Sequence, residues 1–188
     1  MNKELIERYE SIRDQIVPGS IGLVRGNSRL SKTIQWADDA HNNHSFLVFG
    51  SQTKERLMCL DANAPGVQPD FLSQRIGEYE DFTFLVPIGF SNEDLENAVN
   101  KAIAKDLQLN FKYDVWLLPK ILTAKKLGFK VKHNLDTNRT ICSVFTGYHY
   151  GGFLGETNWV NETKRKNYFT PEDHIRFLSP KWKIVRGK

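Results

Sequence analysis

One of the two cysteines in this 188-residue chain stands where it could act as a nucleophile. Cys142 follows Thr-Ile and precedes Ser-Val-Phe, a pattern that predicts the start of a helix. The N–H dipoles of a helix start and a neighbouring imidazolium both lower the pKa of a thiol and favour the reactive thiolate. Taken alone, Cys142 could equally be a small core residue, a metal ligand or half of a disulfide. Its role depends on whether the rest of the chain supplies a base.

His44 is the histidine best placed to be that base. It begins the apolar run HSFLVFG, and Asp61 ends the next such run, RLMCLD, just before a turn. If the two runs pair as an antiparallel hairpin, the start of one lies beside the end of the other. The carboxylate would then orient the imidazole, as in the base and orienter of a catalytic triad. Each residue also has a simpler interpretation, because surface histidines and turn aspartates are common.

The remaining candidate ligands and bases are weaker. Cys59 lies two residues before Asp61, so the two side chains share one face of a strand, and we expect an inert core thiol with no Cys59–Cys142 disulfide. We read His41 as a loop residue. A zinc site built from His44, Cys59, Asp61 and Cys142 is an alternative, but the chain has no Cys-x-x-Cys or His-x-x-x-His spacing. We therefore expect no metal and no other cofactor.

Hydrophobic periodicity predicts the elements that must position these residues. Residues 1–17 read as an amphipathic helix with a regularly spaced apolar face. Strands are predicted at 20–26, 44–50, 55–62 and 81–88, and helices at 31–40, 91–108, 116–128, from Cys142 and from 170–173, with Ser31, Ser91 and Thr170 as N-caps. This order predicts an α+β fold in one domain over residues 1–188, with a mixed or antiparallel sheet packed against helices. The aromatic candidates for the core or a cleft wall, with the core preferred, are Trp36, Trp116, Phe145 and Tyr148.

Several short motifs occur in an order that is similar to one enzyme family. They are PGSIGLV (18–24), NSRLSKTIQWA (27–37), NHSFLVFG (43–50), CLDANAPGV (59–67), FKYDVW (111–116), TICSVF (140–145) and FTPEDHI (169–175). From about residue 18 to its end, the chain resembles the circularly permuted NlpC-type papain-like cysteine hydrolases of the YiiX/YaeF-like branch. It departs from that pattern in having Ser20 in place of an aspartate, Ser45 and Phe46 after the histidine, and Asp61 in place of a glutamate.

The resemblance implies a permuted papain-like fold and a reaction. Cys142 would be the nucleophile, His44 the general base and then acid, and Asp61 the residue that orients His44. Tyr113 would line the oxyanion site beside the Cys142 backbone N–H. The implied chemistry is acyl transfer from an amide, ester or thioester through a thioacyl-enzyme, with a peptide, a peptidoglycan fragment or a lipid-like acyl compound as substrate. A catalytically inactive papain-like binding module is the alternative.

Composition and charge narrow the remaining classes of protein. The formal net charge is +4 and the pI is about 9.0, with basic runs at ETKRKNY and PKWKIVRGK. Such runs could attract an anionic surface or nucleic acid, or could simply be solvated, and no nucleic-acid motif accompanies them. The N-terminus is charged throughout, which is unlike a signal peptide, and no apolar run reaches the length of a membrane span. We therefore expect a cytoplasmic, reduced protein without specific nucleic-acid binding.

Overall fold

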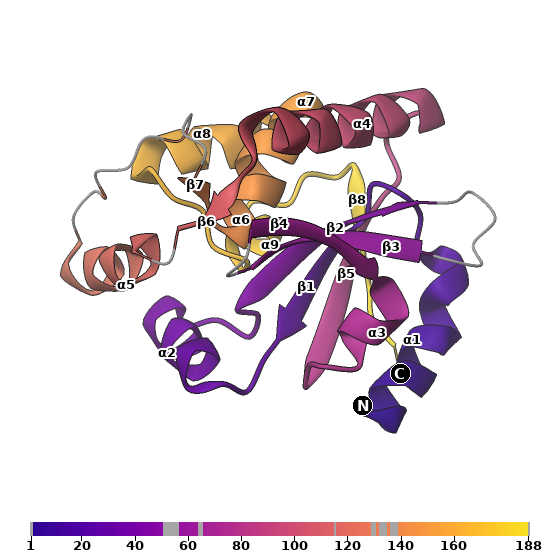
Figure 1. Ribbon diagram of the computed structural model, residues 1–188, viewed down its shortest axis with the longest axis horizontal. Coiled ribbons are helices and arrows are strands. Elements are labelled where there is room, and N and C mark those ends of the chain that lie inside the picture. Colours follow the sequence, from indigo (N-terminus) through magenta and orange to yellow (C-terminus); the bar gives the residue numbers. More distant parts are fainter. Residues whose placement is uncertain are drawn as a thin grey trace.

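The computed structural model describes residues 2–50, 57–63, 66–114, 116–128, 131, 135 and 139–187. It is an α+β protein built on an antiparallel sheet of six strands in the order β4-β3-β2-β1-β5-β8 (Figure 1). The strands are β1 (Ile21–Arg25), β2 (His44–Gly50), β3 (Leu57–Asn63), β4 (Gly66–Phe71), β5 (Asp81–Pro87) and β8 (Trp182–Val185). Two further short strands, β6 (Lys112–Tyr113) and β7 (Arg139–Thr140), form a separate parallel pair.

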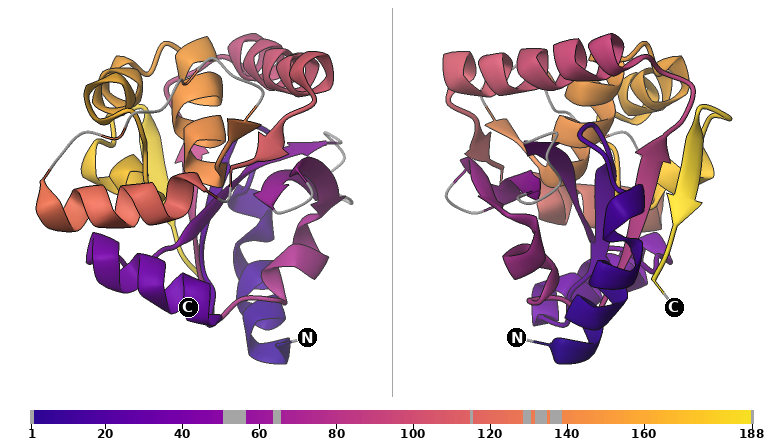
Figure 2. Two further views of the ribbon diagram at one scale, coloured as in Figure 1. Left: turned by 60° about the vertical axis from the view of Figure 1, so that its left-hand side comes forward. Right: turned by 90° about the vertical axis from the view of Figure 1, so that its right-hand side faces the viewer.

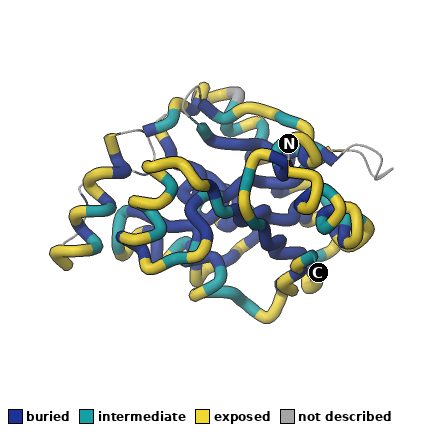
Figure 3. Tube along the Cα trace, turned by 90° about the horizontal axis from the view of Figure 1, so that it is seen from below, coloured by how far each residue is buried: buried dark blue, intermediate teal, exposed yellow. Residues whose placement is uncertain are grey.

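Each face of the sheet is covered by its own set of helices, because apolar side chains alternate between the two faces along every strand. One face packs against α1 (Lys3–Ile12), which the 3₁₀ turn η1 (Arg13–Gln15) extends, and against α3 (Leu72–Ile76). The opposite face packs against α4 (Asn92–Leu109), α5 (Leu117–Leu127) and α8 (Thr157–Lys166). Figure 2 shows these two layers on either side of the strands, and Figure 3 shows the buried segments inside a shell of exposed turns.

A run of helical residues from 142 to 153 crosses the second face of the sheet. It consists of α6 (Cys142–Val144), the π-helix η2 (Phe145–Tyr150) and α7 (Gly151–Phe153). Two helices complete the described part of the chain. They are α2 (Arg29–Asp38), which lies beside α5 (Figures 1 and 2), and the short α9 (Asp173–Arg176).

The expected strands and the longest helix agree with the structure, but two predicted N-caps do not. Ser91 caps α4 by accepting a hydrogen bond from the backbone N–H of Asp94 at 3.1 Å. Ser28, not Ser31, caps α2, since its hydroxyl accepts from the Ser31 N–H at 3.0 Å. Thr170 does not cap a helix with its side chain. The Asp173 carboxylate instead accepts from the Thr170 backbone N–H at 3.0 Å, and α9 begins at Asp173.

The aromatic residues divide between the core and the surface. Phe145 is buried and Tyr148 is partly buried against the same core. The prediction of core positions for Trp36 and Trp116 is wrong, because these side chains are 68% and 71% exposed. Both belong to the α2–α5 pair, which packs on the rest of the protein through its inner faces and leaves these rings on the outside. No helix in the described ranges is long and apolar enough to cross a membrane.

Candidate active site

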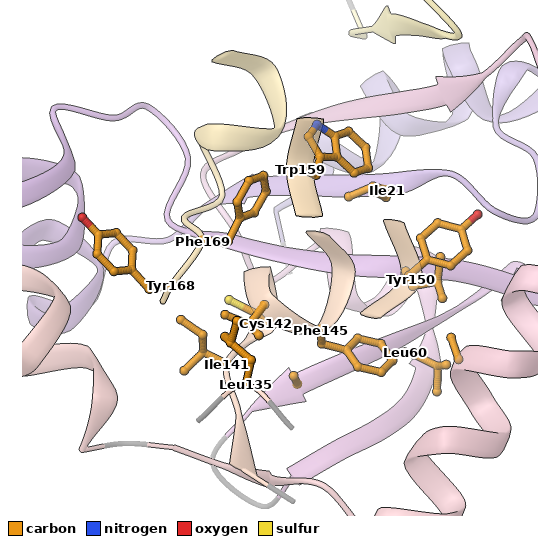
Figure 4. Packing of buried hydrophobic residues seen from close by; sticks show 14 of the residues in the cluster. Ile21, Leu60, Leu135, Ile141, Cys142, Phe145, Tyr150, Trp159, Tyr168 and Phe169 are labelled. Carbon is orange, nitrogen blue, oxygen red and sulfur yellow. The ribbon is translucent and has the colours of Figure 1, made fainter. Parts of the chain in front are cut away.

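Cys142 is the first residue of the helical run that covers the sheet. Ile141 before it is extended, and the Cys142 side chain is only 4% exposed. Figure 4 shows the sulfur among the apolar residues of the core, close to Ile141 and Leu135. Burial of this kind alone would produce an unreactive thiol with a raised pKa. The groups that surround the sulfur therefore decide its chemistry.

The register of the β2–β3 pair brings His44 and Asp61 together. Phe46 lies directly opposite Asp61, so His44, two residues earlier on the same face, is diagonal to the carboxylate. The Nε2 atom of His44 and Oδ1 of Asp61 form a hydrogen bond. His44 also forms a side-chain hydrogen bond with Cys142. The structure thus joins the three residues that the sequence analysis selected, in the order thiol, imidazole, carboxylate.

The electrostatics favour an ion pair between the thiol and the imidazole. Burial opposes ionisation of Cys142, but the charge of His44, its hydrogen bond and a backbone hydrogen bond from Ser45 together lower the pKa of the thiol. Burial likewise opposes protonation of His44. The negative potential of Tyr79, Asp61 and Cys142 nevertheless raises the pKa of the imidazole well above its ordinary value. Both shifts favour a thiolate beside an imidazolium over a neutral thiol beside a neutral ring.

Two residues of this site, Arg75 and Tyr79, were not predicted. Arg75 extends from α3 and forms an ion pair with Oδ2 of Asp61. Although burial opposes ionisation, His44 and Arg75 together lower the pKa of the Asp61 carboxyl. The Tyr79 ring stacks on His44 with centroids 6.1 Å apart, and the Arg75 guanidinium lies 5.6 Å from the centre of that ring. No local pattern marks these residues, because only the turn from β4 into α3 brings them under the end of β3.

Tyr113 lies against the sulfur, as the resemblance implied. Its hydroxyl forms a hydrogen bond with Cys142. The parallel pairing of Tyr113 with Thr140 fixes this position, because Thr140 precedes Cys142 by two residues. Burial and the nearby thiolate raise the pKa of the phenol, so the hydroxyl keeps its proton and acts as a hydrogen-bond donor.

A buried hydrogen-bond chain lies behind Cys142. The Thr146 hydroxyl contacts the Ser45 hydroxyl and His174 Nε2, each at 3.0 Å, and His174 Nδ1 lies 3.1 Å from the Pro171 carbonyl oxygen. Burial lowers the pKa of His174 to about 4, so the ring is neutral. A carbonyl can only accept, so Nδ1 carries the proton and Nε2 accepts from Thr146. Thr146 in turn accepts from Ser45, and the chain holds Ser45, whose N–H points at the sulfur, in one orientation.

Two connected hollows open beside the sulfur. A cavity of about 30 Å³ contacts Cys142 and is walled mainly by apolar residues of α2 and α5. A wider groove of about 520 Å³ contains His44 and the polar side chains of Arg75 and Tyr79. Both hollows share the walls formed by Ile34, Asn43, Tyr113, Leu118 and Leu122. The cavity beside Cys142 and the wider groove thus adjoin one another between α2 and α5.

Of the comparisons with known proteins, the one with solved structures finds a similar protein, and that similarity is one of fold. No family model matches the sequence, and no curated protein matches it. Among solved structures, the metalloprotein YiiX from Escherichia coli O157:H7, DUF1105, superposes with a TM-score of 0.64 at 19% identity. The chain has the fold of YiiX. The match covers 93% of this chain and 98% of YiiX, so the similarity extends over the whole architecture and not only over the hairpin that carries His44.

The other candidates from the sequence lie outside this site. Cys59 is a free, fully buried thiol in the cluster on the α1 face of the sheet, and burial raises its pKa. Cys142 belongs to the cluster on the opposite face. His41 is half exposed and its Nε2 lies 2.7 Å from an oxygen of Asp81, away from the thiol. Among the histidines that the structure describes, His44 is the one hydrogen-bonded to Cys142.

Proposed function

We propose that this protein is a cysteine hydrolase or acyltransferase of the permuted papain-like type, with Cys142 as nucleophile. One observation carries the proposal. Cys142 is hydrogen-bonded to His44, and Nε2 of that same ring is bonded to the carboxylate of Asp61. A nucleophile, a base and an orienting group connected in this order are the functional unit of covalent acyl transfer.

The first half of the reaction forms a thioester. The Cys142 thiolate attacks the carbonyl carbon of an amide, ester or thioester, and the carbonyl oxygen becomes an oxyanion. The Tyr113 hydroxyl and the Cys142 backbone N–H are the donors available beside it. The intermediate collapses as the bond to the leaving group breaks, and the His44 imidazolium gives its proton to that group.

The second half returns the enzyme to its starting state. Neutral His44 takes a proton from water or from another acceptor, whose oxygen or nitrogen attacks the thioester carbonyl. The carbon–sulfur bond then breaks, releasing the acyl product and the Cys142 thiolate beside a protonated His44. Asp61 stays ionised throughout and stabilises the imidazolium, as its lowered pKa requires. Atoms and protons balance over the two halves.

The substitution of aspartate for glutamate at position 61 is compatible with this role. Asp61 is one methylene shorter than the glutamate of the family pattern, yet it bonds directly to His44. Arg75 binds its second oxygen and fixes the carboxylate from the side away from the ring. This pairing supports an active triad over the alternative of an inactive binding module.

A metal does not fit the residues of this site. YiiX is described as a metalloprotein. Within the ranges that the structure describes here, no group of three or more His, Cys, Asp and Glu side chains could hold a metal ion. Both oxygens of Asp61 are bound by His44 and Arg75, which removes the carboxylate as a free ligand. The proposed steps therefore use only groups of this chain.

The test is the pH dependence of Cys142 alkylation by iodoacetamide. We expect Cys142 to react at pH values well below the ordinary thiol pKa of about 8.5, and His44→Ala to move its apparent pKa to that value or above. With a panel of activated esters and thioesters, Cys142→Ala should abolish turnover and His44→Ala should lose nearly as much, because the pair acts as a unit. Cys59→Ala is the matched control. A Cys142 that titrates at the ordinary value regardless of His44 would identify an inactive binding module instead.

A further inference from the structure

The outer surface of the α2–α5 pair has an unusual composition. Among the described residues, seven large apolar side chains are exposed, and four of these lie on this pair. They are Leu30 and Trp36 of α2, Trp116 at the start of α5 and Leu127 at its end, with exposed fractions of 52%, 68%, 71% and 70%. Scattered single apolar residues need no explanation, but four of seven exposed large apolar residues on one pair of helices indicate an interaction region.

The exposed charged residues of the two helices are all cationic. Four exposed cations, Arg29, Lys32, Lys120 and Lys126, come from the two helices. The one acidic residue within either helix is Asp38, which is buried and paired with Lys125 and Arg176. The ammonium of Lys126 lies 4.0 Å from the centre of the Trp36 ring, so cations and aromatic rings are interleaved.

This arrangement fits one kind of partner. Exposed indole rings beside lysine and arginine are typical of segments that lie in the interface of a bilayer, where rings enter the headgroup region and cations contact anionic lipids. We propose that the α2–α5 surface docks on an anionic phospholipid bilayer. α2 and α5 lie at the edge of the molecule (Figures 1 and 2). The exposed rings that belong to this pair can therefore enter a fluid surface without requiring a matching pocket.

The proposed docking surface adjoins the groove that contains His44. Leu30 is part of the exposed cluster and also lines the groove that contains His44. Pro119 and Leu122 of α5 line its other side. A bilayer bound by this surface would therefore lie at the mouth of the groove. The docking itself does not depend on the chemistry of Cys142, so the two proposals can fail separately.

Vesicle co-sedimentation of the full chain tests the proposal. We expect binding to vesicles of phosphatidylcholine mixed with phosphatidylserine, little binding to phosphatidylcholine alone, and weakening by salt, because each cation near an anionic surface contributes about fivefold in affinity. Trp36→Ala with Trp116→Ala should weaken binding at least about tenfold. Lys32→Gln with Lys120→Gln should weaken it about twentyfold. Cys142→Ala should bind like the unmodified chain.

Controls use similar residues on other surfaces. Ile88 is 60% exposed beyond the end of β5, and Lys164 is exposed in the last turn of α8. Ile88→Ala and Lys164→Gln should leave vesicle binding unchanged. Trp159 and Trp182 are buried, so a blue shift of tryptophan emission on vesicle addition reports on the two exposed rings. Equal binding to both lipid mixtures, undiminished binding by the double tryptophan variant, or concentration-dependent dimerisation that the same variant abolishes would overturn the proposal.

Discussion

At the scale of single residues, Asp61 is held between two cations. Its Oδ1 bonds to His44 and its Oδ2 to Arg75, and only 1% of its side chain is exposed. A carboxylate this deeply buried is stable only while its charge is matched. Arg75 thus does two things at once, since it compensates the charge and prevents rotation of the carboxylate away from the imidazole.

Replacing Arg75 should reveal the strength of that pairing. Arg75→Met leaves the Asp61 charge with one partner and should lower the free energy of unfolding by about 3 kcal/mol. In an Asp61→Asn background, Arg75→Met should lower the free energy of unfolding by clearly less, because no buried carboxylate charge remains to be matched. Urea unfolding of the parent chain, the two single variants and the double variant measures this difference in unfolding free energy. Glu78→Gln is the control, since Glu78 also pairs with Arg75 but is half exposed, and it should cost below about 1 kcal/mol. Equal costs in both backgrounds would contradict the pairing.

Thr146 links Ser45 to His174 and should influence the thiol indirectly. Thr146→Val removes the hydroxyl, with its contacts to Ser45, His174 and the Cys142 carbonyl, while keeping the side-chain volume. Ser45 then loses the partner that fixes its orientation. We expect the apparent pKa of Cys142 to rise by up to about one unit, equivalent to 1.36 kcal/mol. Thr146→Ser keeps the hydroxyl and should leave that pKa in place. The iodoacetamide profile separates the two variants, and a purely structural role of Thr146 would leave both profiles unchanged.

At the scale of elements, the helical run after Cys142 contains a π-helical segment that packs closely against Phe169. Gly147 lies in this segment, and a Cβ atom added there would stand 2.4 Å from the Phe169 ring. Phe169 also accepts a hydrogen bond from the Ser143 hydroxyl through its backbone carbonyl. The close approach of the π-helical segment to Phe169 at Gly147 therefore helps to fix the position of the Cys142 end of the helical run.

Substitution at two glycines of this run should have opposite results. Gly147→Ala forces the helix away from Phe169 and should destabilise the protein by about 1–3 kcal/mol, the usual cost of overpacking. Gly152→Ala places its Cβ 3.6 Å from Val160, an ordinary contact, and should be neutral or stabilising by up to about 1 kcal/mol. Thermal unfolding measures both variants. A Gly147→Ala protein as stable as the Gly152→Ala protein would show that the close contact does not constrain the run.

The elements also show how far local patterns predict this structure. Apolar runs with clear ends identified β2 and β5, and an apolar stripe behind a serine N-cap identified α4. The hairpin argument placed His44 beside Asp61 because pairing geometry follows from the order of the strands. Local patterns missed β4 (Gly66–Phe71) and α3 (Leu72–Ile76), and with them Arg75 and Tyr79. β4 lacks alternation and contains Pro69, so only its pairing with β3 makes it a strand.

The aromatic residues were harder to place for a different reason. Trp36 and Trp116 occur in helical patterns that resemble those of buried residues, and composition favours the core for an indole ring. Which helix face turns inward depends on the neighbouring helix, and the pairing of α2 with α5 is not encoded within either segment. The exposed surface therefore became visible only in the structure.

At the scale of the whole molecule, two buried histidines should make the fold sensitive to acid. Burial lowers the pKa of His149 to about 3 and that of His174 to about 4. The unfolded chain binds protons at these positions near pH 6.5, whereas the folded chain does not, so stability is lost as pH falls below about 6.5. By pH 4 each histidine weakens the fold by about 3 kcal/mol.

A variant at His149 isolates this effect. Its Nε2 has no hydrogen-bond partner among the residues that the structure describes, and its ring packs against Phe111 with centroids 5.1 Å apart. His149→Phe should therefore keep the packing and recover about 3 kcal/mol of stability at pH 4, with little change at pH 8. Urea unfolding at the two pH values measures the difference. His41→Phe, at a half-exposed position, should not produce the same recovery. If the stability of His149→Phe falls between pH 8 and pH 4 as steeply as that of the parent chain, His149 is not a source of the acid sensitivity.

The order of the six strands has a consequence for how the chain is made. Five strands of the sheet are complete by residue 87, but Cys142 and the edge strand β8 come much later. On the ribosome, His44 and Asp61 emerge long before the thiol that they contact. A nascent or truncated chain that ends before Cys142 carries the imidazole without its sulfur, and a freshly exposed Cys142 carries the reactivity of an ordinary cysteine until it docks on β2. Under the function proposed above, synthesis itself would thus delay the appearance of the reactive thiolate until the fold around it is nearly complete.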